Sequence, residues 1–386
     1  MIPYGRQTIS EDDIESVVQV LRSDWITQGP TVPLFEEVVA NYCGAEFAVA
    51  VNSATSALHI ACLAMGVGPG DFVWTTPNTF VASANCALYC GASVDFVDID
   101  PFTYNLSAAC LKSKLEQAEK AGTLPKVVIP VHFAGQSCEM KEIATLSRQY
   151  GFRILEDASH AIGGKYKEQP VGNCQFSDIT VFSFHPVKII TSGEGGLALT
   201  NDPVLGELMR LYRSHGLSDQ KEKMSARPES EIWRYQQVNL GYNYRMTDIQ
   251  AALGVSQMKR LDEFVLKRHS IAEQYDTALD GQSVTVPWQH PDAWSSYHLY
   301  PIRVQEAGCG KTQKQVFDAL VSANINVNLH YIPVYRQPYY EAMGFKEGYC
   351  PQAERYFRET ITLPMFPTLS QVDQERVIGA VNNLVS

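Results

Sequence analysis

Short apolar runs alternate with helical stretches along the first half of the chain. The runs favour strands at 46–51, 72–76, 93–98, 127–132, 152–156, 178–184 and 196–200. Stretches of helical periodicity separate the first five of them, at 54–66, 79–90, 107–121 and 139–150, and two earlier helices begin near Ser10 and Val32. Strands that alternate with helices predict an α/β layer with a mainly parallel sheet.

The second half of the chain has a different pattern. We expect one long helical region at about 246–280, strands at 296–304 and 325–329, and helices near 312–322 and 370–385. This order predicts a smaller α+β domain. The polar stretch 217–230 is expected to form an exposed loop. The predicted division is therefore a large domain, 1–255, and a small C-terminal domain, 256–386.

Composition and charge narrow the class of protein. The chain has 386 residues, enough for two domains, and a formal net charge of -11. An acidic surface argues against non-specific binding to nucleic acid, so an anionic substrate would need local donors. The chain shows neither a signal-peptide pattern nor an apolar run long enough for a membrane span. We expect a cytoplasmic protein.

The nine cysteines form no CxxC motif, and their number is odd. Cys86 and Cys90 are four residues apart and could share one helical face. A zinc-binding pair there would need two more ligands, and no second pair is evident. Free thiols in a reducing compartment are the better interpretation, and no metal site is predicted.

A single lysine lies in a loop between two of the apolar runs. Lys188 ends the segment SFHPVK, which follows the strand predicted at 178–184, and a glycine-rich turn leads to the next strand. Loop lysines are usually solvated. Burial between two strands would instead lower the pKa of the amine and keep it nucleophilic. Lys188 is therefore a candidate Schiff-base lysine.

A carboxylate ends another apolar run. Asp157 closes the segment GFRILED, where it could begin a loop or lie buried against a cofactor nitrogen. Glu156 precedes it and should point to the opposite side of the strand, so we assign Glu156 no role.

Other residues could bind a phosphate group or stack on a planar ring. The segment 52–57, NSATSA, lies between a strand and a helix, where hydroxyls and backbone N–H groups bind phosphate or simply cap the helix. Ser183 is a further donor, and Phe80 could stack on a ring or pack in the core. Pyridoxal phosphate (PLP) needs a lysine, an acid facing its pyridine nitrogen, phosphate donors and a flat partner. The chain offers a candidate for each.

Seven motifs in order resemble the nucleotide-sugar aminotransferases of PLP fold type I, the DegT type. They are DWITQGP (24–30), NSATSALH (52–59), TPNTFVAS (75–83), EDASHAIGG (156–164), SFHPVK…GEGG (183–196), RSHG (213–216) and GYNYRMTDIQAALG (241–254). The resemblance covers nearly the whole chain. It implies a large, mostly parallel α/β domain followed by a smaller α+β domain.

The resemblance also implies roles at matching positions. Lys188 would form the Schiff base and act as proton shuttle, and Asp157 would contact the pyridine nitrogen. His160 stands where many members have glutamine, near the ring hydroxyl. The phosphate donors and the stacking ring would be Ala54, Thr55, Ser183 and Phe80. Asn243 would reach the cofactor phosphate of the neighbouring subunit, which makes an obligate homodimer with shared active sites.

Within this family, SFHPVK and the opening IPYGRQTISEDDI resemble the aminotransferases of the bacterial pseudaminic acid pathway. That resemblance implies transfer of an amino group from L-glutamate to C4 of a UDP-linked 4-keto-6-deoxy-N-acetylhexosamine. Enzymes for other nucleotide keto-sugars, of the perosamine, aminoarabinose or bacillosamine type, share the same motifs. Candidate substrate contacts are His330, Tyr331, Trp25, Thr27 and His185, with Arg245 for the glutamate carboxylate.

Two other classes stay open on this sequence. A PLP-dependent sugar dehydratase of the same fold would carry a histidine in place of the lysine, and Lys188 argues against it. A non-catalytic regulatory or binding protein would have no reason to keep Lys188, Asp157 and Asn243, and no DNA-binding module is visible.

Overall fold

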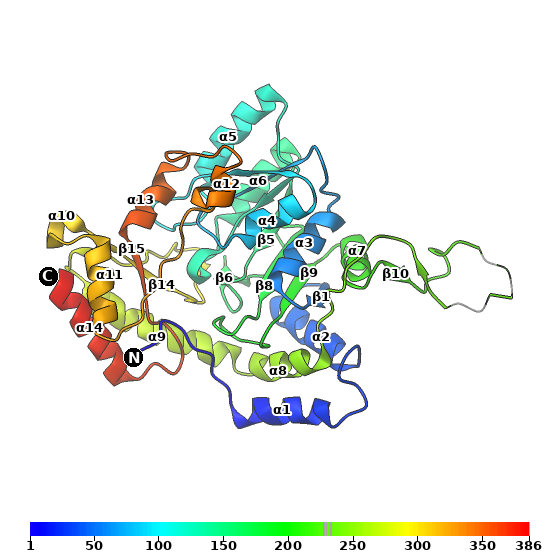
Figure 1. Ribbon diagram of the computed structural model, residues 1–386, viewed down its shortest axis with the longest axis horizontal. Helices are drawn as coiled ribbons and strands as arrows, with labels where there is room; N and C mark the ends of the chain where they lie inside the picture. The colour runs from blue at the N-terminus through cyan, green and yellow to red at the C-terminus, as the bar shows by residue number, and fades with distance from the viewer. Residues whose placement is uncertain (227, 229, 232–233, 386) are drawn as a thin grey trace.

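A seven-stranded sheet organises the first unit of the computed structural model, which describes residues 1–226, 228, 230–231 and 234–385 (Figure 1). In spatial order the strands are β1 (Phe47–Val51), β9 (Gly196–Thr200), β8 (Ile179–Ser183), β5 (Arg153–Asp157), β4 (Val127–Ile129), β2 (Phe72–Thr75) and β3 (Ser93–Phe96). All run parallel except β9, which is antiparallel to both of its neighbours. The mostly parallel α/β sheet confirms the predicted fold class.

Adjacent residues of a strand point to opposite faces of the sheet, so both faces can carry apolar side chains. Helices cover each of the two faces and bury these side chains. Val73 packs in an apolar cluster with Ala57 and Leu58, whereas Trp74 packs in another with Leu111. The helices of this unit are α1 (Glu11–Leu21), α2 (Thr31–Cys43), α3 (Ala54–Ala64), α4 (Ala82–Tyr89), α5 (Ala108–Ala121), α6 (Met140–Tyr150), α7 (Pro203–Arg213) and α8 (Asp248–Met258).

The second unit has its own apolar core around a three-stranded antiparallel sheet. Its strands are β12 (Val284–Thr285), β14 (Tyr300–Val304) and β15 (Thr360–Leu363), and its helices are α9 (Leu261–Leu279), α10 (Glu306–Cys309), α11 (Gln313–Ser322) and α14 (Gln371–Val385). The smaller α+β unit therefore exists as expected. The predicted boundary between residues 255 and 256 falls inside α8 and stays a prediction.

The long helical region predicted at about 246–280 is present. The structure has two helices there, α8 and α9, which are separated by Lys259 and Arg260. Arg260 leaves helical geometry, with φ -114° and ψ 8°, and its guanidinium pairs with the Asp13 carboxylate at 2.5 Å. Arg260 thus contacts the distant helix α1, and helical periodicity alone could not reveal this contact.

The predicted strand at 325–329 is wrong. That segment makes only isolated bridges, from Ile325 to Ile2 and from Asn328 to Thr362. The place beside β14 belongs to β15, which follows α13 (Pro351–Glu359) directly and which the sequence analysis missed. The N-terminus thus lies against the second unit, as Figure 1 shows.

Three smaller features complete the fold. α12 (Pro338–Glu341) and α13 return to the core of the first unit through residues such as Tyr340 and Tyr356. β6 (Lys165–Tyr166), β7 (Gln169–Pro170) and β13 (Ala293–Trp294) form a small sheet. β10 (Leu217–Ser218) and β11 (Gln236–Gln237) form the base of an arm that projects from the body (Figure 1). Residues 227 and 229 of the predicted loop 217–230 lie outside the described residues.

Candidate active site

A cavity of about 460 Å³ lies where β5 and β8 end and β9 begins. Asp157 is the last residue of β5, Ser183 is the last residue of β8, and Ser183 is paired in register with Gly196 of β9. Ligands bind to open α/β sheets at this carboxyl edge, because loops there carry side chains past the ends of the strands. The cavity brings Asp157, Ser183 and Lys188 together.

Lys188 lies in the wall of this cavity, on the loop that leaves β8. Burial lowers the pKa of its amine to about 8, against the opposing attraction of Asp157. A lysine of lowered pKa holds a larger share of neutral, nucleophilic amine near neutral pH. The physical condition that the sequence analysis set for a Schiff-base lysine is therefore met.

Asp157 is 4% exposed, and hydroxyl donors hold its carboxylate in place. Ser83 donates to Oδ2 at 2.6 Å, and Ser159 donates to Oδ1 through its hydroxyl at 2.6 Å and its backbone N–H at 3.1 Å. Glu156 turns to the other face of the strand, where it lies 2.6 Å from His132 Nε2. The expectation that Glu156 points away from Asp157 is confirmed.

The N-terminus of α3 forms a cradle for an anion. Ala54 and Thr55 are the first two residues of α3, both line the cavity, and the Ser53 hydroxyl caps the helix by accepting from the Ser56 N–H. A helix N-terminus presents unpaired N–H groups to a phosphate. A Cβ on Gly196 would lie 2.4 Å from the backbone nitrogen of Ala54, so only glycine leaves room for this close approach.

Phe80 also lines the cavity, just before α4 begins at Ala82. Its ring is 60% exposed, which places it at the rim rather than in the core. The exposure agrees better with a ring that stacks on a ligand than with core packing. His185, beside Lys188, is likewise an exposed lining residue.

His160 is buried in the inner wall, and burial together with the Lys188 charge holds its pKa well below the usual range. Its Nδ1 accepts the Ala134 N–H at 3.3 Å, so the ring proton is on Nε2. That nitrogen lies 3.3 Å from the Tyr331 hydroxyl. His298 lies against the same ring, at 4.4 Å between centroids.

His330 and Tyr331 also line the cavity, as the sequence analysis expected for substrate contacts. Burial lowers the pKa of His330 to about 3, so this ring is neutral. The Asn328 amide donates to its Nε2 at 3.4 Å, which leaves Nδ1–H to donate to the Thr362 hydroxyl at 2.9 Å.

Among the lining residues that the sequence analysis missed are Tyr4, Glu194 and His298. Tyr4 comes from the N-terminal segment, which reaches the site because Ile2 bridges to Ile325. Nδ1 of His298 is buried without a hydrogen-bond partner among the described residues. Glu194 is part of the GEGG motif and Tyr4 is part of the opening IPYGRQTISEDDI, so both could have been proposed, whereas nothing in the sequence marks His298.

Four predicted residues do not line the cavity of their own chain. Trp25 and Thr27 lie in an exposed segment that bridges to α8 through Thr247. Arg245 pairs with Val51 through the backbone, and Asn243 is exposed where it bridges to Ser214. Their proposed roles stay predictions, and Asn243 was expected to act on a second subunit.

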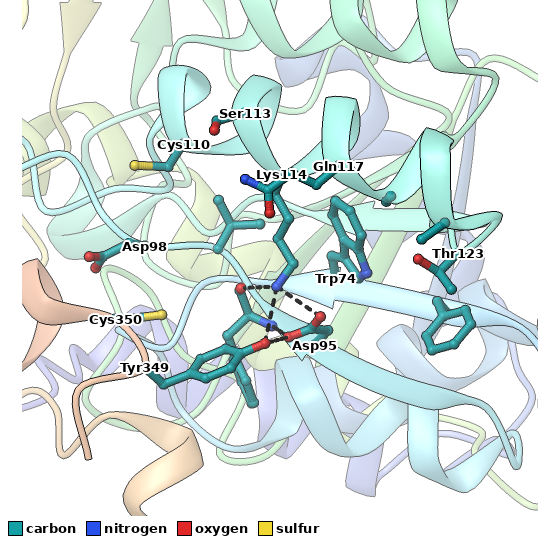
Figure 2. A pocket seen from close by; sticks show the side chains of 15 residues that line it. Trp74, Asp95, Asp98, Cys110, Ser113, Lys114, Gln117, Thr123, Tyr349 and Cys350 are labelled. Carbon is teal, nitrogen blue, oxygen red and sulfur yellow. Dashed lines mark hydrogen bonds and ion pairs between the residues drawn. The ribbon is translucent and has the colours of Figure 1, made fainter. Parts of the chain in front are cut away.

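A second hollow, of about 590 Å³, lies against α5, β2 and β3 (Figure 2). Its one lysine, Lys114, contacts the Phe96 carbonyl at 2.7 Å, the Asp95 carboxylate at 2.8 Å and the Tyr349 hydroxyl at 3.3 Å. These contacts use all three of its N–H donors, so Lys114 has none left for an anionic ligand. Lys114 is thus held by its ion pair with Asp95, whereas Lys188 is a buried amine of lowered pKa.

A family model and a curated relative both match this chain over nearly its full length. The model of the DegT/DnrJ/EryC1/StrS aminotransferase family matches residues 7–382. The chain belongs to this aminotransferase family. It is 39% identical over 387 residues to the spore coat polysaccharide biosynthesis protein SpsC of Bacillus subtilis. The alignment covers 100% of this chain and 97% of that protein.

Solved structures of the family have the same fold. A protein of Streptococcus pneumoniae assigned as a sugar aminotransferase and solved in its PMP form is 31% identical, with a TM-score of 0.89 over 100% of this chain and 99% of that chain. PseC of Helicobacter pylori, an aminotransferase of pseudaminic acid biosynthesis, is 30% identical, with a TM-score of 0.89 over 100% of this chain and 99% of that chain. The predicted family and PLP fold type are confirmed.

Aminotransferases of this family use PLP, and the cavity of this chain fits that cofactor. The anion cradle at α3, the buried Asp157 carboxylate and the amine of Lys188 lie in the same cavity. Within the described residues, no group of His, Cys, Asp and Glu has an arrangement for holding a metal ion. None of the described helices combines the length and the apolar character that crossing a membrane requires.

Proposed function

We propose that this aminotransferase moves the amino group of L-glutamate to C4 of a UDP-linked 4-keto-6-deoxy-N-acetylhexosamine. It would then be a UDP-4-amino-4,6-dideoxy-N-acetyl-beta-L-altrosamine transaminase of pseudaminic acid biosynthesis. The full-length structural similarity to PseC carries this proposal. The segment SFHPVK beside the cavity and the N-terminal segment with Tyr4 support it, because both are part of the resemblance to that pathway.

The residues of the cavity have distinct tasks in this proposal. PLP supplies an electron sink for the carbon that loses its proton. Lys188 would hold the cofactor and, as a free amine, would accept a proton at Nζ and return it. Asp157 keeps the pyridine nitrogen protonated. Ala54, Thr55 and Ser183 would hold the phosphate, Phe80 would stack on the ring, and His160 would lie near the ring hydroxyl.

The substrates enter from the open side of the cavity. His185, His330 and Tyr331 line this space and would contact the sugar. Among the described residues, no arginine lines the cavity, although the carboxylate of glutamate favours a guanidinium partner. Arg245, which lies outside this cavity, would therefore act across a subunit contact, as would Asn243, Trp25 and Thr27.

A homodimer with shared sites follows from this arrangement. The arm at β10 and β11 projects from the body (Figure 1), and nearby apolar side chains are exposed, including Tyr235 at 61% and Leu240 at 73%. Exposed apolar clusters of this kind are typical of subunit contacts. We also place the protein in the cytoplasm, because all nine cysteines are free thiols and a reducing compartment preserves them.

A panel of nucleotide keto-sugars tests the substrate. The purified enzyme with PLP and L-glutamate is offered UDP- and dTDP-linked 4-keto sugars, and the aminated products are identified by mass spectrometry. We expect amination at C4 of the UDP-linked N-acetylhexosamine. Failure on every UDP-linked sugar would eliminate the pseudaminic assignment and leave the aminotransferase family intact.

One observation favours a second candidate, an aminotransferase for another nucleotide keto-sugar. The identity to SpsC, 39%, is higher than the 30% identity to PseC, and SpsC is described by its part in a spore coat polysaccharide. Perosamine-, aminoarabinose- and bacillosamine-type substrates belong in the same panel. Amination of one of these in preference to the UDP-linked N-acetylhexosamine would establish that alternative.

A further inference from the structure

Three buried histidines, His160, His298 and His330, line the cavity. Two of them, His160 and His330, use both ring nitrogens in hydrogen bonds within the protein, at 2.9 to 3.4 Å. A neutral imidazole has one donor and one acceptor, so these two rings have no position left for a ligand. His298 is the histidine of this group whose ring nitrogens are not used in this way.

The ring of His298 is 5% exposed, and neither of its nitrogens bonds to a described residue. Nδ1 is enclosed and Nε2 is not, so Nε2 is the nitrogen that a ligand in the cavity can reach. Buried polar side chains nearly always have a hydrogen-bond partner. A buried imidazole that lacks one and lines a ligand cavity therefore indicates that the ligand supplies the partner.

The backbone that carries His298 is held in an unfavourable conformation. Tyr297, the residue before it, has φ 47°, a left-handed value that tyrosine rarely adopts. The Ser296 hydroxyl donates to the His160 carbonyl at 2.9 Å, and the Ser296 N–H donates to the Gly135 carbonyl at 3.0 Å. Strain of this kind persists where surrounding contacts enforce it, and it is concentrated at functional sites.

Arg268 of α9 is one of the groups that hold this backbone. Its guanidinium is 1% exposed, and Nη1 donates to the carbonyls of Tyr297, His298 and Met365 at 3.1, 3.2 and 3.0 Å. The Met365 N–H in turn donates to the Tyr4 carbonyl at 3.0 Å. Arg268 thus joins the two segments that bring Tyr4 and His298 to the cavity.

The charge of the His298 ring limits the groups that it can bind. Burial holds the pKa of His298 well below its usual range, and neighbouring cations, Lys188 and Arg268 among them, act in the same direction. The ring is therefore neutral, and Nε2 presents either one N–H or one lone pair. A hydroxyl group matches both possibilities because it donates and accepts, whereas a carboxylate or a phosphate gains more from a charged donor.

We propose that Nε2 of His298 binds a hydroxyl group of the sugar that accepts the amine, and that Arg268 is the positioning residue for this contact. The identity of the hydroxyl rests on the substrate given under Proposed function. In that hexose C1 carries UDP, C2 the acetamido group, C4 the ketone and C5 the ring oxygen, and C6 is deoxygenated. The hydroxyl that remains is on C3, next to the ketone, so this contact also holds the reacting carbon in place.

Equilibrium binding tests this contact without turnover. The PLP form of the enzyme has no amino group to transfer, so calorimetry can measure its binding of the UDP-linked 4-keto sugar and of the 3-deoxy analogue. For the unmodified enzyme, we expect loss of the hydroxyl to weaken binding by about 5- to 160-fold. In His298→Phe the two dissociation constants should agree within about twofold, because the hydroxyl has lost its partner.

Two control variants separate the contact from a general effect on structure. His298→Gln keeps a group that donates and accepts, so it should recover part of the discrimination against the 3-deoxy analogue. His59→Phe is the matched control, because His59 is also buried with an unpaired ring nitrogen but is not one of the described residues that line the cavity. It should discriminate as the unmodified enzyme does.

Arg268→Lys tests the positioning residue. Lysine keeps the charge but lacks the planar group that spans the three carbonyls, so the preference for the 3-hydroxyl should decrease while PLP affinity stays unchanged. Circular dichroism confirms that the variant is folded, and His298→Phe gives the same test if Arg268→Lys does not fold. A general structural effect would weaken both sugars equally and leave their ratio as it was.

The possible failures are distinguishable. If the unmodified enzyme binds both sugars equally, or if His298→Phe keeps the full discrimination, the contact with His298 is overturned and the proposed function is untouched. If the unmodified enzyme binds neither UDP-linked sugar, the proposed substrate is wrong and the assignment of the C3 hydroxyl is overturned with it.

Discussion

The Tyr331 hydroxyl lies 3.3 Å from Nε2 of His160, at the inner wall of the cavity. Because the Ala134 N–H donates to Nδ1 of His160, the ring is fixed as a donor toward Tyr331. The tyrosine oxygen then accepts from the histidine, and its own proton is free to point into the cavity. A side chain that departs from the glutamine of many relatives thus orients a predicted substrate contact.

Tyr331→Phe should weaken the reaction with the sugar ketone more than the reaction with glutamate. Loss of one hydrogen bond costs about 1 to 3 kcal/mol when a partner is left unpaired, which is about 5- to 160-fold in kcat/KM. His160→Gln keeps an N–H donor for Tyr331 and should retain most of the activity, whereas His160→Leu should behave like Tyr331→Phe. Single-turnover absorbance changes with each substrate measure the two halves separately. Equal loss in both halves would contradict this role.

The lowered pKa of Lys188 predicts the pH dependence of cofactor attachment. A lysine whose pKa is lowered loses its proton at lower pH, so the reactive amine should increase through pH 8 and reach a plateau above it. An ordinary lysine would require about pH 10.4. The measurement is the rate of the absorbance change when PLP is added to apoprotein at different pH values.

Lys188→Ala is the control for that experiment. It should fold, leave PLP unattached after borohydride reduction, and show no multiple turnover. A midpoint near 10 in the unmodified protein, or borohydride trapping at another lysine, would show that Lys188 is not the attachment site.

Asp157→Asn should mainly lower kcat, whereas Glu156→Gln should mainly lower the free energy of unfolding. Removal of the Asp157 charge should lower kcat by about 10²- to 10³-fold, the range seen when a preorganised electrostatic partner is lost, with little change in folding. Glu156→Gln weakens the contact with His132 on the other face and should lower the free energy of unfolding by about 1 to 3 kcal/mol. Urea unfolding and steady-state kinetics on both variants provide the comparison. The reverse pattern would place the functional carboxylate at Glu156.

Gly196→Ala should damage the anion cradle. The added Cβ would lie 2.4 Å from the Ala54 nitrogen, so strand β9 and the start of α3 must separate, at about 1 to 3 kcal/mol. PLP affinity, measured by fluorescence titration, should decrease together with thermal stability. Gly379→Ala is the control, because a Cβ there meets nothing within 4 Å, and in helix α14 it should stabilise by about 0.5 to 1 kcal/mol. Unchanged PLP affinity in Gly196→Ala would contradict the cradle.

Asn243 and Lys188 should complement each other across subunits. Lys188→Ala and Asn243→Ala dimers should each be nearly inactive. When the two variants are mixed and exchange subunits, half of the dimers are hybrids with one intact site of two, so about a quarter of the wild-type activity should return. Activity assays after subunit exchange measure this recovery. No recovery, despite exchange shown by native mass spectrometry, would mean that Asn243 acts within its own chain.

Most of the first unit could be predicted from the sequence because its signals are local. Each of the seven predicted strands of the main sheet is present, and alternation of side chains correctly separated Asp157 from Glu156. The contact of Arg260 with Asp13 and the replacement of 325–329 by β15 could not be predicted, because both depend on partners far away in the chain.

The sequence by itself determined the family, the cofactor and the candidate residues Lys188 and Asp157, because these depend on residue types at fixed positions along the chain. Only the tertiary structure decided which other side chains share their cavity. It brought in Tyr4 and His298, placed Trp25, Thr27 and Arg245 outside, and set the proton of His160 on Nε2. The physical reason is that burial and hydrogen bonding arise from elements that meet only on folding, and these contacts lower the pKa of Lys188 and orient Tyr331.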